Sequence, residues 1–201
     1  MNLHKNKVFV QIGTYNGKDK FNLFARQFSP EKVILVEPNK SLEQIIKYNY
    51  RKVEHVYLES VAITAEKTGN VKLVVPNKLG YSDGHFTFIP MDGWGEDLKQ
   101  MEVPSMTFQE LCEKYQITHI HYLEIDTEGY DSEIIKSIDF NNIKIDYMQY
   151  EFWGFNKSYF VSYGKDAVKY GRRAMKSTRF MLESLGYKLT RVNGNVIAEY
   201  I

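Results

Sequence analysis

The chain has 201 residues, 43% apolar and 25% charged, a composition that suits one globular domain with a sizeable core. Its formal net charge of +1 gives no electrostatic footprint for nucleic acid or an anionic membrane, so we predict neither as a partner. No apolar run is long enough to span a bilayer, and the polar first residues do not resemble a signal peptide, which predicts a cytoplasmic protein.

The first third of the chain predicts alternating strands and helices. Apolar runs indicate the strands, and apolar residues at helical spacing indicate the helices, with Ser41 as the expected N-cap of the second helix. In chain order the expected elements are strand 7–13, helix 18–28, strand 31–38, helix 41–50 and strand 55–64. This alternation predicts a parallel sheet with right-handed crossovers.

The middle of the chain differs, because its strands alternate and glycines surround them. Residues 70–76 and 84–90 predict a strand pair, followed by a loop that lasts to about residue 103. We therefore treat residues 69–103 as an insertion on the substrate side. A helix then begins with Ser105 or Thr107 as its cap and contains the single cysteine, Cys112, which is expected to be a small buried side chain.

The last third returns to the α/β pattern. The expected elements are strand 118–126, helix 131–138, strand 144–152, a helix over 166–185 that Gly186 ends, and a hairpin of two strands around Asn193–Gly194. We expect a single domain over residues 1–201. Because the chain begins shortly before its first strand and stops on its last, we also consider it a module of a longer polypeptide.

Two short motifs near the start suggest a nucleotide-like ligand. In "QIGTYNGKD", Gly13 and Gly17 bracket the turn between the first strand and the first helix, where backbone can approach a ligand or simply turn tightly. In "VILVEPN", Glu37 ends the second strand, about 20 residues further on, where an acid can accept hydrogen bonds from ribose hydroxyls.

The stretch "LEIDTEGYD" places three carboxylates at the end of the fourth parallel strand. If the strand order reverses after the third strand, this strand lies beside the first, and Asp126 faces the ligand held by Gly13 and Glu37. Asp126 is therefore the preferred functional residue. Glu128 can equally be a functional residue or an exposed carboxylate of the loop. Asp131 is expected to cap the helix that follows.

Together these motifs resemble the FkbM-type methyltransferases, a branch of the class I methyltransferases that depend on S-adenosylmethionine (SAM). The matching segments, in the family's order, are "VFVQIGTYNGKD", "ILVEPN", "SVAIT", "VPSMTFQEL", "YLEIDTEGYD", "MQYEF" and "LESLGYKL". The resemblance implies an α/β fold with a Rossmann-like, mostly parallel seven-stranded sheet, an antiparallel C-terminal hairpin and helices on both faces.

The resemblance also implies a set of cofactor-binding residues for SAM and its product, S-adenosylhomocysteine (SAH). Carried onto this sequence they are Gln11, Gly13, Thr14, Tyr15, Asn16, Gly17, Glu37, Pro38, Ser60 and Val61. Position 11 departs from the family, which has an acid there, usually Asp. The amide of Gln11 can accept a hydrogen bond but cannot offer a charge to the ammonium group of the cofactor.

The implied reaction is methyl transfer to a hydroxyl of a small molecule, with a sugar in a glycan as the favoured acceptor. Asp126, Glu128 and Glu151 are the candidate catalytic acids, with Asp126 preferred as general base and Glu151 second. His85 is a weaker candidate base. The expected substrate contacts are His85, Trp94 and Trp153, because aromatic rings can stack on a sugar.

Several alternatives stay open at this point. A divalent metal held by Asp126 with Glu128 or Asp131 is conceivable, but no full ligand set is visible and we predict no metal. His119 and His121 are better explained by packing than by zinc. A nicotinamide-dependent oxidoreductase is the weakest rival, since Tyr15 and Lys18 replace glycines of its motif. A further alternative, suggested by Gln11, is a module that binds the cofactor but is catalytically inactive.

Overall fold

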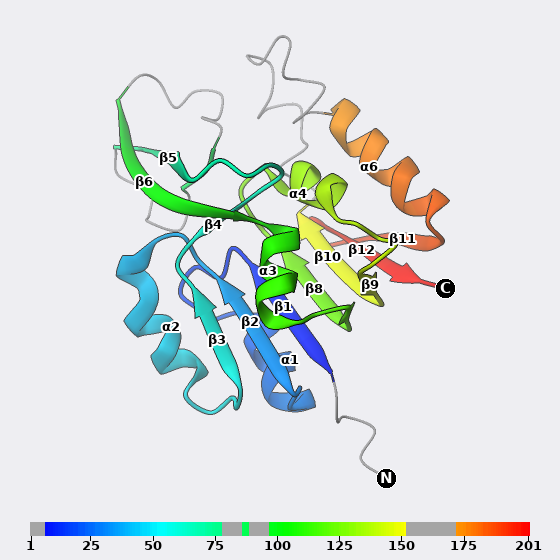
Figure 1. Cartoon of the computed structure of the whole chain (residues 1–201), viewed down its shortest axis with the longest axis horizontal. Helices are drawn as coiled ribbons and strands as arrows, with labels where there is room; N and C mark the ends of the chain where they lie inside the picture. The colour runs from blue at the N-terminus through cyan, green and yellow to red at the C-terminus, as the bar shows by residue number, and fades with distance from the viewer. Residues whose placement is uncertain (1–6, 78–85, 89–96, 152–171) are drawn as a thin grey trace.

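The computed structural model describes residues 7–77, 86–88, 97–151 and 172–201, which form a mixed α/β structure around a seven-stranded sheet (Figure 1). The strands in spatial order are β11 (Tyr187–Val192), β12 (Asn195–Tyr200), β10 (Tyr147–Glu151), β8 (Tyr122–Ile125), β1 (Val8–Ile12), β2 (Lys32–Val36) and β3 (Val56–Glu59). The strands from β10 to β3 are parallel, and β12 is antiparallel to both its neighbours. The predicted fold class is confirmed.

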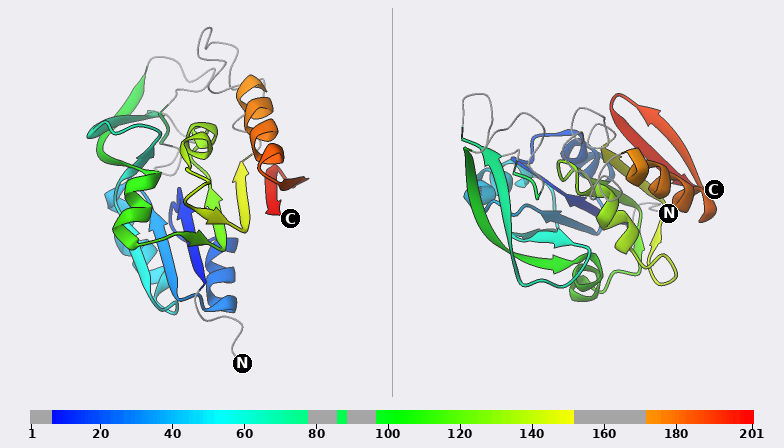
Figure 2. Two further views of the ribbon diagram at one scale, coloured as in Figure 1. Left: turned by 45° about the vertical axis from the view of Figure 1, so that its right-hand side comes forward. Right: turned by 90° about the horizontal axis from the view of Figure 1, so that it is seen from above.

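Helices cover both faces of this sheet, as expected (Figure 2). They are α1 (Lys20–Phe28) and α2 (Glu43–Tyr50) on one face, and α3 (Phe108–Tyr115), α4 (Asp131–Ser137) and α6 (Arg172–Ser184) on the other. Consecutive strand residues point to opposite faces, so Phe9 packs with Phe21 of α1 while Val10 joins the core with Leu111 of α3. Burial on both faces explains why the strand sequences are almost continuously apolar.

The strand order reverses at β1, which pairs with β2 on one side and β8 on the other. In an open α/β sheet this switch point leaves a crevice beyond the carboxyl ends of the strands. The predicted neighbourhood of the first and fourth parallel strands is therefore confirmed, and Gly13, Glu37 and Asp126 each follow directly on one of these strands.

A second, three-stranded sheet lies beyond the carboxyl ends of the main strands (Figures 1 and 2). Its order is β4 (Ala62–Thr64), β6 (Leu98–Thr107) and β5 (Asn70–Pro76). The expected loop to residue 103 is wrong, because β6 pairs antiparallel with β5 over 98–104 and parallel with β4 over 105–107. Of the predicted strand 84–90 only 86–88 are described, and Thr87 bridges Val74 of β5.

Three predicted strands are each divided in two. The run 55–64 breaks at Ser60–Val61 into β3 and β4, which belong to different sheets. The runs 118–126 and 144–152 break at His121 and Asp146, giving β7 (His119–Ile120) before β8 and β9 (Lys144–Ile145) before β10. The two breaks lie side by side, and β7 pairs with β9 in a separate short sheet. The sequence pattern of a strand alone does not predict such a break.

The helix caps agree with the sequence in most places. Thr107 caps α3 in a reciprocal capping box with Glu110. Ser41 is not the cap of α2, because it lies inside a short 3₁₀ turn, η1 (Lys40–Leu42), whose N-cap is Asn39. Positive φ angles of 47° at Asn193 and 89° at Gly194 confirm the expected hairpin turn between β11 and β12.

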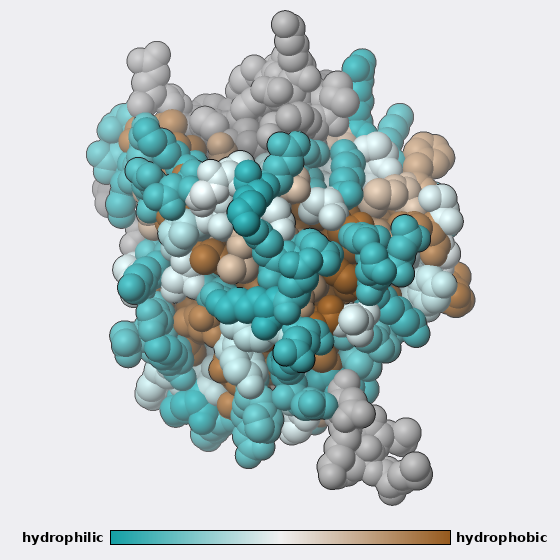
Figure 3. Space-filling model, viewed as in Figure 1, coloured by the Kyte–Doolittle hydropathy of each residue, from teal (hydrophilic) through white to brown (hydrophobic). Residues whose placement is uncertain are grey.

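The face of the molecule seen in Figure 1 is mostly hydrophilic, with hydrophobic atoms in small scattered areas (Figure 3). Cys112 is 2% exposed, and burial raises the pKa of its thiol to about 12, as expected of a packing residue. Among the residues that the structure describes, none of the helices has the length and apolar character needed to cross a bilayer.

Candidate functional site

A cavity that is partly open to solvent lies at the switch point of the main sheet. Its described walls are Ile12, Gly13, Tyr15, Val36, Glu37, Pro38, Val61, Ala62, Ile63, Leu73, Phe86, Thr87, Phe88, Asp126, Thr127 and Glu128. The ends of β1, β2 and β8 supply its acids, and β4, β5 and the 86–88 segment supply apolar walls. An apolar cleft with a few converging polar groups is the usual form of a small-molecule site.

The two glycines of the turn after β1 pack closely against other parts of the chain. The backbone N–H of Gly13 donates to Val36 O at 2.9 Å, and Gly13 has a φ of +87°. A Cβ at Gly13 would lie 1.8 Å from Asp126 O, and one at Gly17 would lie 2.8 Å from the ring of Tyr50. Packing therefore requires glycine at both positions, which agrees with the tight-turn interpretation of this motif. Gly13 also lines the cavity.

Glu37 is held in place by the backbone of two loops. Its Oε2 accepts from Tyr15 N at 2.7 Å and its Oε1 from Asn39 N at 2.8 Å. The residue is 7% exposed, and burial raises the pKa of its carboxyl to about 7 although both hydrogen bonds act in the opposite direction. The preorganised oxygens face the cavity and can accept hydrogen bonds from a diol.

Asp126 and Glu128 bring two carboxyl groups to the cavity from the end of β8. Burial raises the pKa of the Asp126 carboxyl to about 7, and the charges of Asp131 and Asp19 add to the rise, although part of the residue is accessible to solvent. Glu128 is half-buried, and burial together with Asp126 and Asp131 raises its pKa to about 8. Groups that titrate near neutral pH are suited to proton transfer.

Asp131 is not a helix cap and does not face the cavity. It is the first residue of α4, is 1% exposed, and its Oδ1 accepts from the N–H and hydroxyl of Thr127. Its Oδ2 accepts from Glu151 N at 3.0 Å. Asp131 thus ties the loop after β8 to the end of β10.

The structure brings together seven of the residues predicted for the site, and their roles stay predictions. They are Gly13, Tyr15, Glu37, Pro38, Val61, Asp126 and Glu128. Outside the described walls of the cavity lie Gln11, Thr14, Asn16, Gly17, Ser60 and Glu151. The predicted substrate contacts His85, Trp94 and Trp153 fall outside the described residues.

The apolar wall was missed by the sequence analysis. Leu73, Phe86 and Phe88 line the cavity, and Phe88 packs on Tyr130 with ring centroids 4.5 Å apart. The alternating segment "GHFTFIP" was the available signal, because it presents Phe86 and Phe88 on one side of a strand.

The whole arrangement agrees with a family comparison. The sequence matches the methyltransferase FkbM domain over residues 11–189. The chain belongs to the FkbM methyltransferase family. This FkbM domain is therefore a methyltransferase that takes its methyl group from SAM and leaves SAH as the demethylated product. No protein of curated function matches the sequence.

One solved structure supports the fold at low sequence identity, and others align less closely. A methyltransferase FkbM from Methylobacillus flagellatus KT aligns with a TM-score of 0.53 and 11% identity over 98% of this chain and 44% of that one. The Methanococcus jannaschii fibrillarin pre-rRNA processing protein aligns at 0.49 and 11%, over 100% and 69%. TrmK of M. capricolum in complex with SAH aligns at 0.47 and 10%, over 96% and 62%.

The departure of Gln11 from the family pattern has a structural reason. Gln11 is 1% exposed, and its Nε2 donates to Asp19 Oδ2 at 2.9 Å and to Glu124 Oε1 at 2.8 Å. Burial, with a further contribution from Asp19, raises the pKa of Glu124 to about 7, although a hydrogen bond from Tyr122 opposes the rise. An acid at position 11 would add a third carboxyl group to this pair.

We therefore expect Gln11→Glu, which exchanges an N–H donor for an acceptor, to destabilise the fold by about 2–4 kcal/mol near pH 8. In the folded protein these carboxyl groups have raised pKa values, so as the pH falls they become protonated before the same groups in the unfolded chain do. The loss of stability in Gln11→Glu should therefore shrink as the pH falls toward about 5. Urea unfolding at both pH values measures it. Gln27→Glu is the control, since Gln27 is exposed on α1. Equal losses in the two variants would contradict this account.

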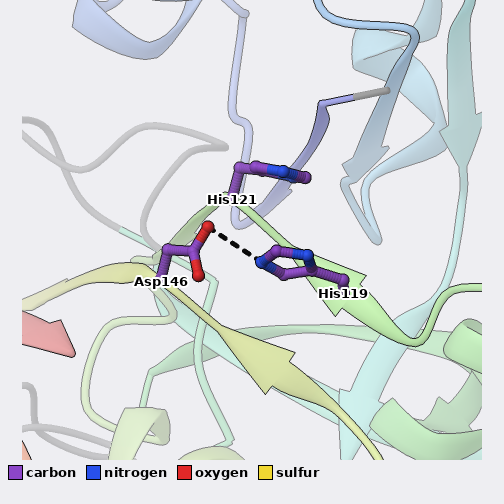
Figure 4. Close-up of side chains that lie close together, drawn as sticks. All are labelled: His119, His121 and Asp146. Atoms are coloured by element: carbon purple, nitrogen blue, oxygen red, sulfur yellow. Dashed lines mark ion pairs between the residues drawn. The ribbon is translucent and has the colours of Figure 1, made fainter. Parts of the chain in front are cut away.

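A second polar cluster lies at the start of β8, away from the cavity at its end (Figure 4). One ring nitrogen each of His119 and His121 and one carboxylate oxygen of Asp146 lie within 4.8 Å of one another. The two imidazole rings stack with their centroids 4.1 Å apart. His119 Nε2 contacts Asp146 Oδ2 at 2.8 Å, while His121 Nδ1 accepts from Val8 N at 3.1 Å. A neutral His121 must then carry its proton on Nε2, so it has no free lone pair for a metal.

Proposed function

We propose that this FkbM domain transfers the methyl group of SAM to a hydroxyl oxygen of a small molecule, with a sugar of a glycan as the favoured acceptor. The observation that supports it is the pair Asp126 and Glu128, which faces the same cavity as Glu37 across the switch point of the sheet. An acceptor hydroxyl needs a proton acceptor beside it, and these carboxyl groups titrate near neutrality.

The chain's own residues have separable tasks in this proposal. Glu37 would bind the ribose hydroxyls, and the apolar wall around Val61 and Phe86 would hold the adenine. When bound, SAM supplies a methyl group activated on a sulfonium. Asp126 would accept the hydroxyl proton at its carboxylate, while the cavity walls hold the two reactants in line. Such alignment supplies roughly 7–11 kcal/mol of the barrier, more than a base does.

Hydroxyl specificity and the glycan acceptor are inferences from the resemblance to the FkbM-type enzymes and from the acid pair. The cytoplasmic location and the single domain over residues 1–201 stay predictions. The inactive module stays an alternative, although the hydrogen bonds from Gln11 to Asp19 and Glu124 give a structural reason for an amide at this position. The oxidoreductase alternative is disfavoured by membership of a methyltransferase family.

Transfer of label from methyl-labelled SAM to a panel of neutral sugars and oligosaccharides, with amines as a parallel panel, tests the reaction. Calorimetry tests the site: Glu37→Ala is expected to weaken SAH binding at least about tenfold, or 1.4 kcal/mol, because the diol loses both acceptor oxygens. Glu43→Ala, an exposed acid paired with Lys47, is the control. Labelled amines would contradict O-methylation, and SAH binding without any transfer would support the inactive module.

A further inference from the structure

The acids of the cavity differ in how their charge is balanced. Glu37 receives two backbone N–H groups, at 2.7 and 2.8 Å. The carboxyl groups of Asp126 and Glu128 receive no hydrogen bond and no ion pair from any residue in the described parts of the chain. The described walls also contain no Lys, Arg or His. Two carboxylates of one cavity therefore depend on water for their stabilisation.

The groups that face these two acids from neighbouring elements are acidic as well. Asp131, at the start of α4, and Asp19, at the start of α1, both act on Asp126, and Asp131 also acts on Glu128. Glu37 at the end of β2 faces the same space. The charged groups that the structure describes around the cavity are thus all acidic.

A ligand that fills the cavity displaces the water on which the pair depends. A neutral ligand would leave two carboxylates with neither water nor a partner, and such groups become protonated instead. A ligand with a positive charge in the cavity would supply the missing counter-charge. SAM and SAH differ in this respect, because the sulfonium of SAM is positive and the thioether of SAH is neutral.

The position of Glu128 is fixed by the inserted segment. Its backbone has a φ of +54°, which is unfavourable for a residue with a side chain, and Gly129 follows at +106°. Its carbonyl oxygen accepts from Thr87 Oγ1 at 2.8 Å. Thr87 is 1% exposed and exchanges two backbone hydrogen bonds with Val74 of β5, at 2.8 and 3.0 Å. Glu128 is held at the cavity by this chain of contacts.

We propose that Asp126 and Glu128 together make the site selective for charge, so that it binds the methyl-bearing SAM in preference to its demethylated product SAH. The inference rests on the proposed cofactor site. It predicts that methyl transfer itself removes the attraction and so favours release of the product. It also predicts that SAM binding depends on pH, because only the ionised carboxylates attract the sulfonium.

The sign of this dependence follows from the raised pKa values. Near pH 6 both carboxyl groups are largely protonated, and near pH 8.5 they are largely ionised. A bound cation favours the ionised form, so SAM binding releases protons and tightens as the pH rises. SAH offers no counter-charge at its sulfur and leaves the carboxylates without water, so its binding does not tighten and weakens as they ionise. We expect SAM to bind at least about tenfold tighter than SAH near pH 8.5 and less than about threefold tighter near pH 6.

Calorimetric titration of the purified chain with SAM and with SAH at both pH values tests the proposal without any acceptor. Glu128→Gln and Asp126→Asn keep the size of the side chain, and each is expected to reduce the SAM-to-SAH ratio near pH 8.5 at least about threefold. Glu113→Gln, an acid on the exposed side of α3, should leave the ratio unchanged. Thermal melting of each variant confirms that it is folded.

Two outcomes would overturn the proposal, and they are distinguishable. If SAM and SAH bind with the same ratio at both pH values and in all variants, the charge selection is wrong while the cofactor site stands. If neither ligand binds the wild-type chain, the proposed cofactor site is wrong and the selection falls with it.

Discussion

Gly13→Ala is expected to lower the free energy of unfolding by at least about 3 kcal/mol, because two penalties coincide. The residue has a φ of +87°, which costs an alanine roughly 1–2 kcal/mol. The added Cβ would also lie 1.8 Å from Asp126 O and 2.8 Å from Asp126 C, which are backbone atoms at the junction of β1 and β8. Neither strand can move away without breaking its pairing with the other.

Gly69→Ala separates the two penalties. Gly69 has nearly the same backbone conformation, with a φ of +80°, but no atom lies within 4 Å of the position of a Cβ. This variant should lose only the conformational part, about 1 kcal/mol. Urea unfolding of the two variants and the wild type measures the difference. Similar losses would show that the loop at Gly13 yields to the clash, and that the end of β8 is more adaptable than the structure indicates.

The sequence predicted where the site residues lie but not what they contact. Gly13, Glu37 and Asp126 were predicted together because β-α-β alternation and a reversal of strand order bring strand ends to one place. That reasoning is topological and does not say what each residue contacts. The glycines proved to be needed for contacts with Asp126 and Tyr50, and Asp131 proved to bridge Thr127 and Glu151. Long-range contacts of this kind leave no local pattern.

The elements that were missed have a similar cause. The breaks at His121 and Asp146 fall inside segments rich in β-branched and aromatic residues, and neither Gly nor Pro marks them. The strand β6 contains Pro104 and two charged residues, Lys99 and Glu102, so its sequence favours a loop. Pro104 is tolerated because β6 changes partner there, pairing with β5 before this residue and with β4 after it. Only the partner strands determine that this segment is extended.

The largest effect on the reaction is expected from Asp126→Asn. The substitution keeps the shape of the side chain and removes its capacity to accept a proton, so kcat should fall by about 10²–10⁴-fold. Binding of SAH should change less than about threefold, since SAH carries no charge on sulfur for Asp126 to attract. Single-turnover transfer from labelled SAM to an acceptor identified by the panel, beside calorimetry with SAH, separates the two quantities.

Glu128→Gln is the matched comparison, because Glu128 lines the same cavity and its carboxyl group also titrates near neutrality. If Asp126 is the base, Glu128→Gln should keep most of the turnover at saturating SAM and lose mainly affinity for SAM. The pH dependence of kcat should then retain an ascending limb near neutrality in Glu128→Gln and lose it in Asp126→Asn. The reverse pattern would assign proton transfer to Glu128, held at the cavity by Thr87, and leave Asp126 as the charge that attracts the sulfonium.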